Sequence, residues 1–470
     1  MSLESSVEVA EAAVQCVAAE ECQQIPEEKP EIFGIFCMFF FALVSCVLGV
    51  IVIVVWPSIV KKLIQADFVL SDGSISYASC VANPSLSYLK VYVFNWTNSD
   101  DVYNKSVKPH FEELGPYVFQ EYKNRTNWIW HSNGTVSFIQ ARSWKFLSGL
   151  SKGRTLNDTI ISLNPAEAPV PLKRASINKK RARVTTTIRN LLFNEDHLIL
   201  GQPTGEFTFS RFSGNFTMST GSTNLSTLGN IYFLNGLDRT EAYAEGCDIV
   251  QGSLGELWPP MTKQSIHKFL FSPELCRSIL LSYSGHIGEE QTDTTKWTFD
   301  EATMASGKIY NESRCYCPDS DYNRCPPNGL VDISKCWRGI PFYVSYPHFF
   351  MADAYLVESL SGIHPNRSIH RSLMYIDIQT GLLLQSYIRL QFNLRLRPSQ
   401  DFELSKGISR DVFIPVFWYS QEMKADDRIA RKARESIQRT KWGLYIALGL
   451  FAIAAVLVVC IVSRLLSCLN

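Results

Sequence analysis

Two long apolar runs lie near the two ends of the chain. Residues 32–55 hold 24 consecutive positions without a charged side chain, and residues 444–462 hold 19. As a helix the first run is about 36 Å long at ~1.5 Å per residue, enough to cross the roughly 30 Å hydrocarbon core of a bilayer with some tilt. It is also too long for a cleaved signal peptide, and an acidic leader precedes it. We therefore predict two transmembrane helices, at residues 32–55 and 444–463.

Between these runs, several short segments alternate apolar and polar residues. From Ile388 to Leu396 every second residue is apolar, which is typical of a strand with one buried and one solvent-facing side. Similar patterns predict strands at residues 89–94, 134–139, 206–212 and 373–378, the last followed by a turn at 379–381. Fewer segments predict helices, and these are residues 261–271, 273–282 and 422–441. The middle of the chain is therefore expected to be rich in strands.

Two spans place both ends of the chain on one side of the membrane and the middle segment on the other. Basic residues at the ends of the middle segment, such as Lys61 and Arg439, would place it in the cytosol under the positive-inside rule, but that rule is weak for a long loop. Nine Asn-x-Ser/Thr sequons favour the lumenal or extracellular side, because all lie between the two runs. The predicted glycosylation sites are Asn95, Asn104, Asn124, Asn133, Asn157, Asn215, Asn224, Asn311 and Asn366.

The cysteines of the middle segment indicate the same compartment. Seven of the 13 cysteines lie there, six of them in its second half. Zinc sites usually need Cys-x₂₋₄-Cys pairs and often histidine, and Cys315-x-Cys317 is too tight for the usual knuckle. Disulfide bonds in an oxidising compartment are the better interpretation, although spacing alone leaves their pairing open. We predict no metal site and no cofactor.

Charge is balanced over the whole chain but not along it. Lysine and arginine total 45, as do aspartate and glutamate, so net charge points to no class of partner. Residues 168–194, however, hold seven basic residues and no acidic one. This stretch is either a solvated loop or helix face, or a docking patch that attracts anionic ligands. The candidate docking residues are Lys173, Arg174, Lys179, Lys180, Arg181 and Arg183.

Three alternative functional classes receive little support. The stretch from Gly149 to Gly153 fits the Gly-x-Ser-x-Gly turn of serine hydrolases, but that motif needs a strand before it, a helix after it and acid and histidine partners. Ser71-Asp-Gly-Ser loosely resembles a phosphate loop of two-span ecto-nucleotidases, which carry several, and this chain has no second. A two-span channel usually has polar residues that line its pore, whereas only Ser45 and Gly49 notably interrupt the first apolar run. We expect no enzymatic activity.

Several longer motifs are more specific than these. They are Trp56-Pro57, Gly73-Ser-Ile, Leu114-Gly-Pro-Tyr117, Asn133-Gly-Thr-Val-Ser-Phe138, Cys247-Asp-Ile, Trp258-Pro-Pro, Cys276-Arg-Ser-Ile, Gly329-Leu-Val-Asp-Ile-Ser-Lys-Cys336, Tyr346-Pro-His-Phe349 and Phe413-Ile-Pro-Val-Phe-Trp418. With them the chain resembles the class B scavenger receptor family, which includes fatty acid translocase, the lysosomal integral membrane proteins and the insect sensory neuron membrane proteins. The resemblance extends over roughly residues 32–465.

The resemblance implies a fold. It is an α+β membrane protein in which two transmembrane helices flank one large ectodomain, residues 56–443, with cytoplasmic tails at residues 1–31 and 464–470. The ectodomain is expected to have an antiparallel β-barrel core, an apical helical bundle at about residues 150–195 and a tunnel for lipid. The implied disulfide bonds are Cys247–Cys315, Cys276–Cys336 and Cys317–Cys325. Cys80 has no family partner, and a buried free thiol is favoured over a link between two chains.

The resemblance also implies a function. The basic cluster falls in the segment where the family binds lipoproteins, apoptotic surfaces or carrier proteins, although Pro165, Pro169 and Pro171 break the helix that the family usually has there. The implied protein is a cell-surface scavenger receptor that binds anionic lipid-rich ligands, such as lipoproteins, fatty acids, or apoptotic or microbial surfaces, and passes lipid through its tunnel to the membrane. The alternative is an adhesion or lysosomal cargo receptor without lipid transfer. Protein ligands at the apex and a homo-oligomer are further expectations, and nucleic acid is not a partner.

The tails carry weaker signals. Membrane-near cysteines are candidates for palmitoylation. No acidic dileucine signal is present, since Leu465-Leu466 directly follows Arg464. This favours the plasma membrane over the lysosome or endosome, with both termini cytoplasmic. The candidate palmitoylation sites are Cys16, Cys22, Cys460 and Cys468.

Overall fold

The computed structural model describes residues 29–80, 86–103, 107–163, 183–193, 201–261, 267–286, 294–337, 340–398 and 409–469. The chain divides into two compact units. The first, Met1–Val60 with Thr440–Asn470, is called the helix unit below. The second, Lys61–Arg439, is called the sheet unit.

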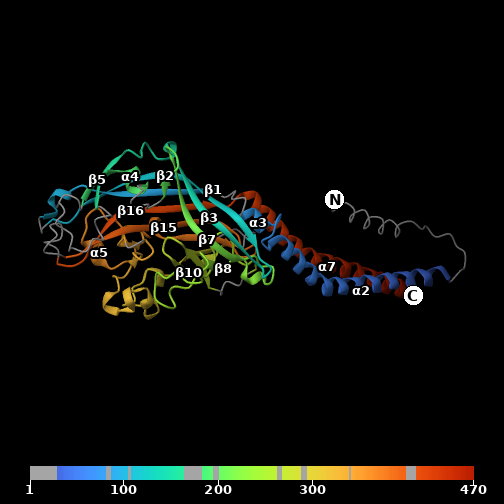
Figure 1. The fold of residues 1–470 in the computed structure, drawn as a ribbon. Coiled ribbons are helices and arrows are strands. Elements are labelled where there is room, and N and C mark those ends of the chain that lie inside the picture. The colour runs from blue at the N-terminus through green and yellow to red at the C-terminus, as the bar shows by residue number, and fades with distance from the viewer. Residues whose placement is uncertain are drawn as a thin grey trace. The chain divides into compact units, whose positions relative to one another are not determined.

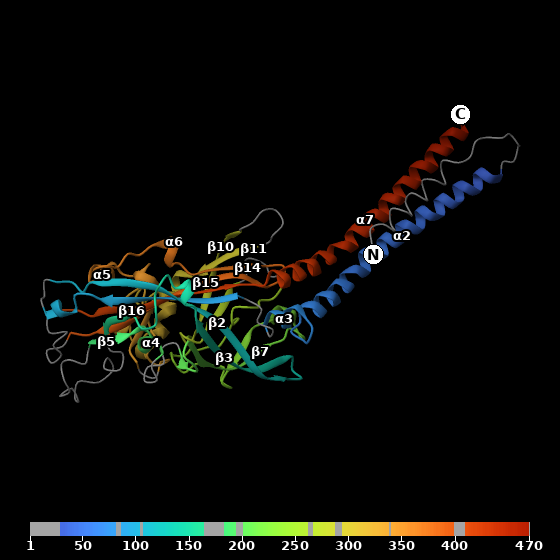
Figure 2. The ribbon, with the colours of Figure 1, turned by 90° about the horizontal axis from the view of Figure 1, so that it is seen from above.

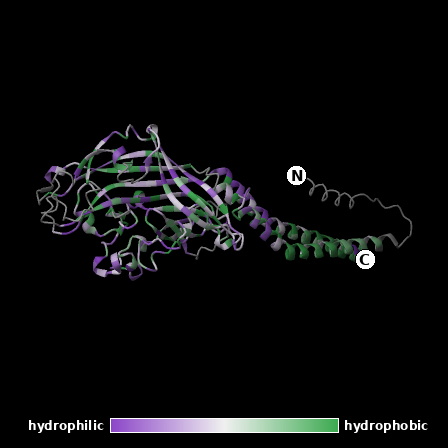
Figure 3. Ribbon diagram, in the orientation of Figure 1, coloured by the Kyte–Doolittle hydropathy of each residue, from purple (hydrophilic) through white to green (hydrophobic). Residues whose placement is uncertain are grey.

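The helix unit is built from parts of two long helices, α2 (Lys29–Phe68) and α7 (Asp427–Leu469). These helices contain the two predicted apolar runs, and both are long and apolar enough to cross a membrane. Figure 3 shows long hydrophobic stretches in both helices. Their apolar side chains are largely exposed, Phe33 to 70% and Val459 to 67%, as suits helices that face lipid. The protein is therefore a membrane protein with two candidate spans.

A close contact joins the two helices within the helix unit. The indole Nε1 of Trp56 donates a hydrogen bond to the carbonyl oxygen of Thr440 at 2.8 Å. A Cβ atom at Gly443 would lie 2.0 Å from the Trp56 ring, so only glycine fits at that position. Small residues at helix interfaces let two helices in a membrane approach closely.

One antiparallel sheet of 14 strands forms the frame of the sheet unit (Figure 1). Its main path runs β6-β7-β3-β2-β1-β16-β15-β14-β11-β10-β9, and β8, β12 and β13 attach beside it. The strands are β1 (Leu86–Trp96), β2 (Phe111–Trp130), β3 (Thr135–Phe146), β6 (Gln202–Pro203), β7 (Thr208–Ser219), β8 (Ile231–Leu234), β9 (Lys268–Ser272), β10 (Arg277–His286), β11 (Thr294–Phe299), β12 (Val331–Asp332), β13 (Phe342–Ser345), β14 (Leu373–Asp377), β15 (Leu383–Leu396) and β16 (Val412–Lys424).

The sheet curls so that its two ends face each other. Figure 2 shows β10, β11 and β14 on the opposite side of the unit from β2, β3 and β7. Arg142 on β3 nevertheless forms an ion pair with Glu274, which lies in the turn between β9 and β10 at the far end of the sheet. The predicted antiparallel core is thus confirmed, although the pairings among the described residues do not join the two end strands.

Strand β15 shows where the alternating pattern was only partly informative. Leu390, Phe392 and Leu394 are buried, as predicted. The polar side chains of Gln391 and Asn393, expected to face solvent, are fully buried as well. The reason is that β13 pairs with this part of β15, and the segment after β13 covers it: the His348 amide donates a hydrogen bond to the Gln391 side chain at 2.6 Å. The buried amides are satisfied by each other and by backbone groups, for example the Asn393 Nδ2–H bond to the Tyr343 carbonyl at 3.0 Å.

Two predicted helices are strands. Residues 268–272 form β9 and residues 277–286 form β10, so the helices predicted at 261–271 and 273–282 are wrong. Ile279 and Leu281 point into the core at a period of two, and Ile279 lies opposite Leu270 of β9. The prediction at 422–441 is correct from Asp427 onward, where α7 begins. The strand predicted at 373–378 is confirmed as β14.

Residues 150–195 also differ from the expected helical bundle where the structure describes them. A separate two-stranded sheet, β4 (Thr159–Leu163) with β5 (Arg183–Thr187), is followed by one short helix, α4 (Ile188–Phe193). The β-branched run of threonines in β5 favours a strand. Residues 164–182, where more of the bundle was predicted, lie outside the described residues.

Candidate functional site

Most of the predicted docking residues lie outside the described residues. These are Lys173, Arg174, Lys179, Lys180 and Arg181. Arg183 is described, and its Nη1 lies 2.5 Å from the Asp100 carboxylate and 3.1 Å from the Ser99 hydroxyl. Its charge is therefore already paired within the sheet unit. Docking on the other five residues remains a prediction.

The predicted glycosylation sites differ in exposure. Asn95 is half-buried, and its Oδ1 accepts a hydrogen bond from the Ile161 amide at 2.9 Å. Asn104 lies outside the described residues. The remaining seven are exposed and are the stronger candidates for a glycan: Asn124, Asn133, Asn157, Asn215, Asn224, Asn311 and Asn366.

Three disulfide bonds cross-link the second half of the sheet unit. They join Cys247 to Cys315, Cys276 to Cys336 and Cys317 to Cys325, the pairing that the family resemblance implies. Cys80 is free and buried, as favoured from the sequence. Of the candidate palmitoylation sites, Cys460 is a free, partly exposed thiol in α7, and Cys468 also lies in α7. Cys16 and Cys22 lie outside the described residues.

The serine of the Gly-x-Ser-x-Gly motif has a structural role. The Ser151 side chain is buried. Its hydroxyl donates to the Leu147 carbonyl at 2.8 Å and accepts from the Val118 amide at 3.0 Å. Both hydrogen bonds fix a turn after β3, so the hydroxyl is not presented to a substrate.

An unusual feature of the sheet is the charged inner face of β2. Glu121, Lys123 and Arg125 follow one another at every second position, so they share one face of the strand. The side chains of Glu121 and Arg125 are exposed to only 0% and 3%, and that of Lys123 to 14%. Charged side chains are rarely buried unless they are paired. Partners from other segments of the chain therefore determine what this face can do.

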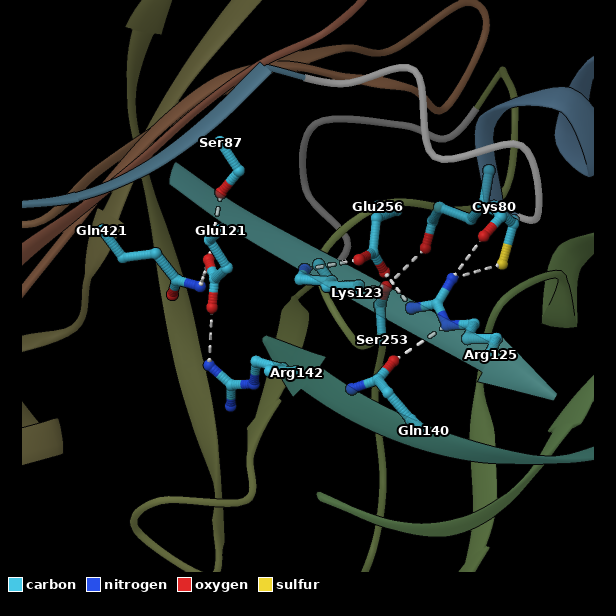
Figure 4. A network of polar contacts seen from close by, with 12 residues as sticks. Cys80, Ser87, Glu121, Lys123, Arg125, Gln140, Arg142, Ser253, Glu256 and Gln421 are labelled. Atoms are coloured by element: carbon cyan, nitrogen blue, oxygen red, sulfur yellow. Dashed lines mark hydrogen bonds and ion pairs between the residues drawn. The ribbon is translucent and has the colours of Figure 1, made fainter. Parts of the chain in front are cut away.

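The first group of partners surrounds Arg125 and is called the Arg125 network (Figure 4). The Arg125 guanidinium donates to the Glu256 carboxylate at 3.1 Å and to the Cys80 sulfur at 2.8 Å. Lys123 binds the other Glu256 oxygen at 2.5 Å, and Gln140 accepts from Arg125 Nε at 2.8 Å. Burial would raise the pKa of Glu256, but Arg125 and Lys123 outweigh it and hold that pKa at about 2. Burial raises the pKa of the Cys80 thiol to about 11, so it stays protonated.

The second group surrounds Arg142 and is called the Arg142 network. Glu121 accepts hydrogen bonds from Ser87 at 3.0 Å and from Gln421 at 2.6 Å, and its other oxygen lies 3.4 Å from Arg142 (Figure 4). Arg142 also pairs closely with Glu274. The residues come from β1, β2, β3, β16 and the β9–β10 turn, so this network ties the curled sheet together across its interior.

Local structure holds Glu274 in place. Its carbonyl oxygen accepts from the Trp337 indole at 2.8 Å, and its carboxylate accepts from Ser272 at 3.1 Å. Cys276, two residues on, is tied by its disulfide bond to Cys336. The turn that carries Glu274 is therefore anchored from two sides.

Two small cavities adjoin the Arg142 network. The first, called the aliphatic cavity, has a volume of about 50 Å³ and is lined by Leu270, Ile279, Met374, Leu383, Ile388 and Met423, among others. The second, called the aromatic cavity, has a volume of about 70 Å³ and is lined by Trp144, Trp337, Phe392 and Tyr419, among others. Both are also lined by Arg142 and Glu274. Sites for small molecules usually measure ~300–1,000 Å³, so each of these two cavities is well below that size.

A larger cleft of about 1060 Å³ lies elsewhere, between the disulfide-bonded segment and the ends of β15 and β16. Its lining includes exposed bases such as Lys308, Lys335 and Arg397 as well as the tyrosines Tyr316 and Tyr355. Sequence reasoning did not single out this cationic surface, because its residues are far apart in the chain.

The charged interior was also missed, although the sequence held a signal for it. Asn124 belongs to a sequon, and a glycosylated side chain must face outward. Its neighbours on the same strand alternate with it, which places Lys123 and Arg125 on the inner face. The partners Glu256 and Glu274 could not be predicted in this way, because they come from distant segments.

A buried histidine pair forms a third polar cluster. His348 lies in the short 3₁₀-helix η9 (Pro347–Phe349), and its Nε2 is 2.6 Å from Glu113, which also accepts from the Trp418 indole at 2.7 Å. The His348 and His370 rings stack with centroids 4.6 Å apart. Burial lowers the pKa of His370 to about 4, with His348 and Arg389 acting in the same direction and Glu113 against it. His370 is therefore neutral in the folded protein.

His370 makes stability depend on pH. The pKa of His370 is lower in the folded protein than in the unfolded chain, where it is ~6.5. The unfolded chain therefore binds the additional proton, and stability falls as pH falls from about 6.5 to about 4. We expect a contribution of no more than about 3 kcal/mol. Unfolding of the wild type and of His370→Gln should be compared at pH 7 and pH 4.5. The wild type should lose more stability than the variant, and equal losses would contradict the assignment.

These features define a class of protein: a two-span membrane protein with one large, disulfide-bonded antiparallel sheet domain. The chain belongs to the CD36 family, whose sequence profile matches residues 37–465. It is 29% identical over 412 residues to scavenger receptor class B member 1 of Sus scrofa, covering 81% of this chain and 79% of that protein. It is 27% identical over 408 residues to Protein peste of Drosophila melanogaster, covering 80% of this chain and 72% of that protein. It is 25% identical over 494 residues to sensory neuron membrane protein 2 of Manduca sexta, covering 92% of this chain and 95% of that protein.

Proposed function

We propose that this protein is a cell-surface scavenger receptor that binds anionic lipid-rich ligands and passes lipid through the interior of the sheet unit to the membrane. Membership of the CD36 family and the relatives named scavenger receptors support the first part. The observation that carries the second is the pair of adjoining cavities inside the curled sheet, bordered by residues from both of its ends. In this proposal the particle docks on the basic segment at residues 168–194 and single lipid molecules then enter the interior.

The proposed mechanism is physical rather than chemical. A lipid-rich particle and a bilayer are both apolar phases, and a continuous apolar passage between them lowers the cost of moving a lipid through water. Net flow then follows the concentration gradient and needs no ATP. The buried Ser151 hydroxyl supports a receptor rather than a hydrolase.

The proposed location is the plasma membrane, with the sheet unit outside and both termini in the cytosol. Seven exposed sequons and three disulfide bonds, all in the sheet unit, support an oxidising compartment. Mutating Cys460 and Cys468 and measuring acyl labelling tests the proposed cytosolic palmitoylation.

Charge reversal in the basic segment is expected to weaken particle binding. The variant Lys179→Glu/Lys180→Glu/Arg181→Glu changes the local charge by six units, and long-range attraction of an anionic particle depends on that charge. Binding of anionic lipoprotein to cells that display the variant should fall by about tenfold or more at low salt, and the difference should shrink at high salt. Arg183 is left unchanged because it already pairs with Asp100.

The matched control reverses Lys308 and Lys335, which line the large outer cleft. If only the control variant loses binding, the particle docks in the cleft rather than on the basic segment. Unchanged binding of the first variant, at a normal surface level, would contradict the proposed docking site.

One observation favours a second candidate function. Both interior cavities, at about 50 and 70 Å³, are far smaller than a usual ligand site. An adhesion or cargo receptor would need the docking surface and no passage. Particle binding without lipid delivery would favour this candidate.

A further inference from the structure

The large outer cleft of about 1060 Å³ carries an excess of basic side chains. Six bases and three acids line it. A concave surface lined mainly by one sign of charge raises the local concentration of ligands of the opposite sign. The cleft is therefore suited to an anionic ligand. The bases are Lys308, Arg324, Lys335, Arg395, Arg397 and Arg410, and the acids are Asp319, Asp332 and Asp411.

Two of the six bases pair with acids of the lining. Arg324 pairs with Asp319, and Arg395 pairs with Asp411. The third acid, Asp332, accepts a hydrogen bond from the Ser334 amide at 2.9 Å. Within the part of the chain that the structure describes, the other four bases form no ion pair, and all four are exposed. These are Lys308, Lys335, Arg397 and Arg410.

A second observation is that two arginines at the cleft have donors without acceptors. The Arg395 Nε–H is buried and has no hydrogen-bond partner among the described residues. The same holds for the Nε–H of Arg277, which is 4% exposed. The Arg277 guanidinium lies 3.5 Å from the centre of the Tyr316 ring, which lines the cleft. A buried donor without a partner costs free energy, and an anion in the cleft would reduce that cost.

The unpaired bases are held on two rigid walls. Lys335 directly precedes Cys336, whose disulfide bond to Cys276 fixes one wall. On the other wall Arg397 directly follows the end of β15, and Arg410 lies over the Tyr355 ring at 4.5 Å from its centre. Side chains that are ordered before a ligand arrives lose less conformational entropy when it binds. The cleft is therefore preorganised for a ligand that contacts both walls.

The lining also indicates the class of anion. Protein partners usually anchor an aromatic or aliphatic side chain in a pocket. Here Arg277 covers one face of the Tyr316 ring and Arg410 one face of the Tyr355 ring, so cationic groups stand where an apolar anchor would need bare rings. Sites for small molecules usually measure ~300–1,000 Å³, so this cleft is large enough for a segment of a polymer. A linear polymer with several anionic groups fits these features.

We propose that the outer cleft binds a sulfated polysaccharide of the glycosaminoglycan class. Lys308, Lys335, Arg397 and Arg410 contact its sulfate groups, and the Nε–H of Arg395 gains an acceptor. Such a polymer is stiff and carries anions at regular intervals, so it loses less conformational freedom on binding than a flexible acidic peptide. The inference adds a second binding surface to the protein. It depends neither on the passage of lipid nor on the basic segment at residues 168–194.

The test measures binding of a heparin oligosaccharide to the full chain in phosphatidylcholine nanodiscs, with empty nanodiscs subtracted. Lys335→Gln/Arg397→Gln, which neutralises one base on each wall, should weaken binding at low salt by about tenfold or more. The difference should shrink at high salt. The matched control, Lys145→Gln/Lys152→Gln, removes the same charge from two exposed lysines outside the cleft and should leave binding unchanged.

Four outcomes would overturn the inference. Equal weakening by the cleft variant and the control would show attraction to total charge alone, and no change in the cleft variant would exclude the cleft. Loss of binding in Lys179→Gln/Lys180→Gln, with normal binding in the cleft variant, would place the polymer on the basic segment. Competition by polyglutamate as effective as that by heparin would favour an acidic peptide.

A second variant guards against misfolding. If Lys335→Gln/Arg397→Gln does not reach the folded state, Lys308→Gln/Arg410→Gln decides by the same comparison with the control. Particle binding and lipid delivery are measured separately from heparin binding. The proposed receptor function and this inference can therefore fail independently of each other.

Discussion

Replacing Glu256 with glutamine is expected to destabilise the sheet unit by about 3–5 kcal/mol, the usual cost of breaking a buried ion pair by removing one partner. Glu256 is the carboxylate that binds both Lys123 and Arg125, at 2.5 and 3.1 Å. Without it two cations remain in the interior with too little negative charge. The loss should appear as a lower midpoint of urea unfolding for the full chain in detergent.

The pH dependence of stability in the same variant is a second test of these ion pairs. The pKa of Glu256 is about 2 in the folded protein against an ordinary value of 4.5. Its stabilising effect is therefore complete above about pH 4.5 and is lost as pH falls toward 2. The difference in stability between wild type and Glu256→Gln should shrink over that range.

A double variant is the matched control. Arg125→Met/Glu256→Met removes the carboxylate together with the more deeply buried of its two counter-charges, and apolar replacement of a buried ion pair is often nearly neutral. Its cost should be clearly smaller than the sum of the two single substitutions. A loss below about 1 kcal/mol for Glu256→Gln alone would show that water, rather than Arg125 and Lys123, compensates this carboxylate.

The second large effect is expected from the disulfide bond that anchors the Glu274 turn. Cys276 and Cys336 are 60 residues apart, whereas Cys317 and Cys325 are 8 apart. In the chain-entropy account a cross-link stabilises by restricting the unfolded chain, more so for a longer loop. Cys276→Ser/Cys336→Ser should therefore cost about 4 kcal/mol and Cys317→Ser/Cys325→Ser about 2.5 kcal/mol.

The two variants serve as controls for each other, since each removes one disulfide bond and two sulfur atoms. The measurement is unfolding by urea together with the fraction of protein that reaches the cell surface. Equal stability losses for the two variants would contradict the loop-length argument.

Local patterns predicted the parts of the fold that local forces determine. The two spans follow from uninterrupted apolar runs, and β1, β3 and β15 follow from a period of two. The same reasoning failed at residues 273–282, where Ile279 and Leu281 belong to a strand. Pairing with β9, which depends on a turn at Pro273 and Cys276, outweighed the local tendency to form a helix.

The candidate site was harder to predict than the fold. In the strand register Lys123 of β2 lies opposite Arg142 of β3, and Arg142 lies opposite Arg211 of β7. Glu274 reaches Arg142 because the sheet curls until its far end faces β3, and no spacing in the sequence encodes either contact. The disulfide pairing could not be deduced from the spacing of the cysteines and came from the family resemblance. Physical reasoning on the sequence predicted the two spans and an oxidising compartment, and tertiary structure was needed to locate the interior charges.

The central claim, that lipid passes through the interior of the sheet unit, can be tested by measuring lipid delivery into a bilayer. The full chain is reconstituted in liposomes, and lipoprotein particles carrying a labelled fatty acid are added outside. Ile388→Trp, which fills the aliphatic cavity from β15, serves as the blocked variant. The account predicts delivery faster than into protein-free liposomes, and slow delivery with unchanged particle binding for the blocked variant. Equal delivery by the wild type, the blocked variant and protein-free liposomes, despite normal particle binding, would contradict it.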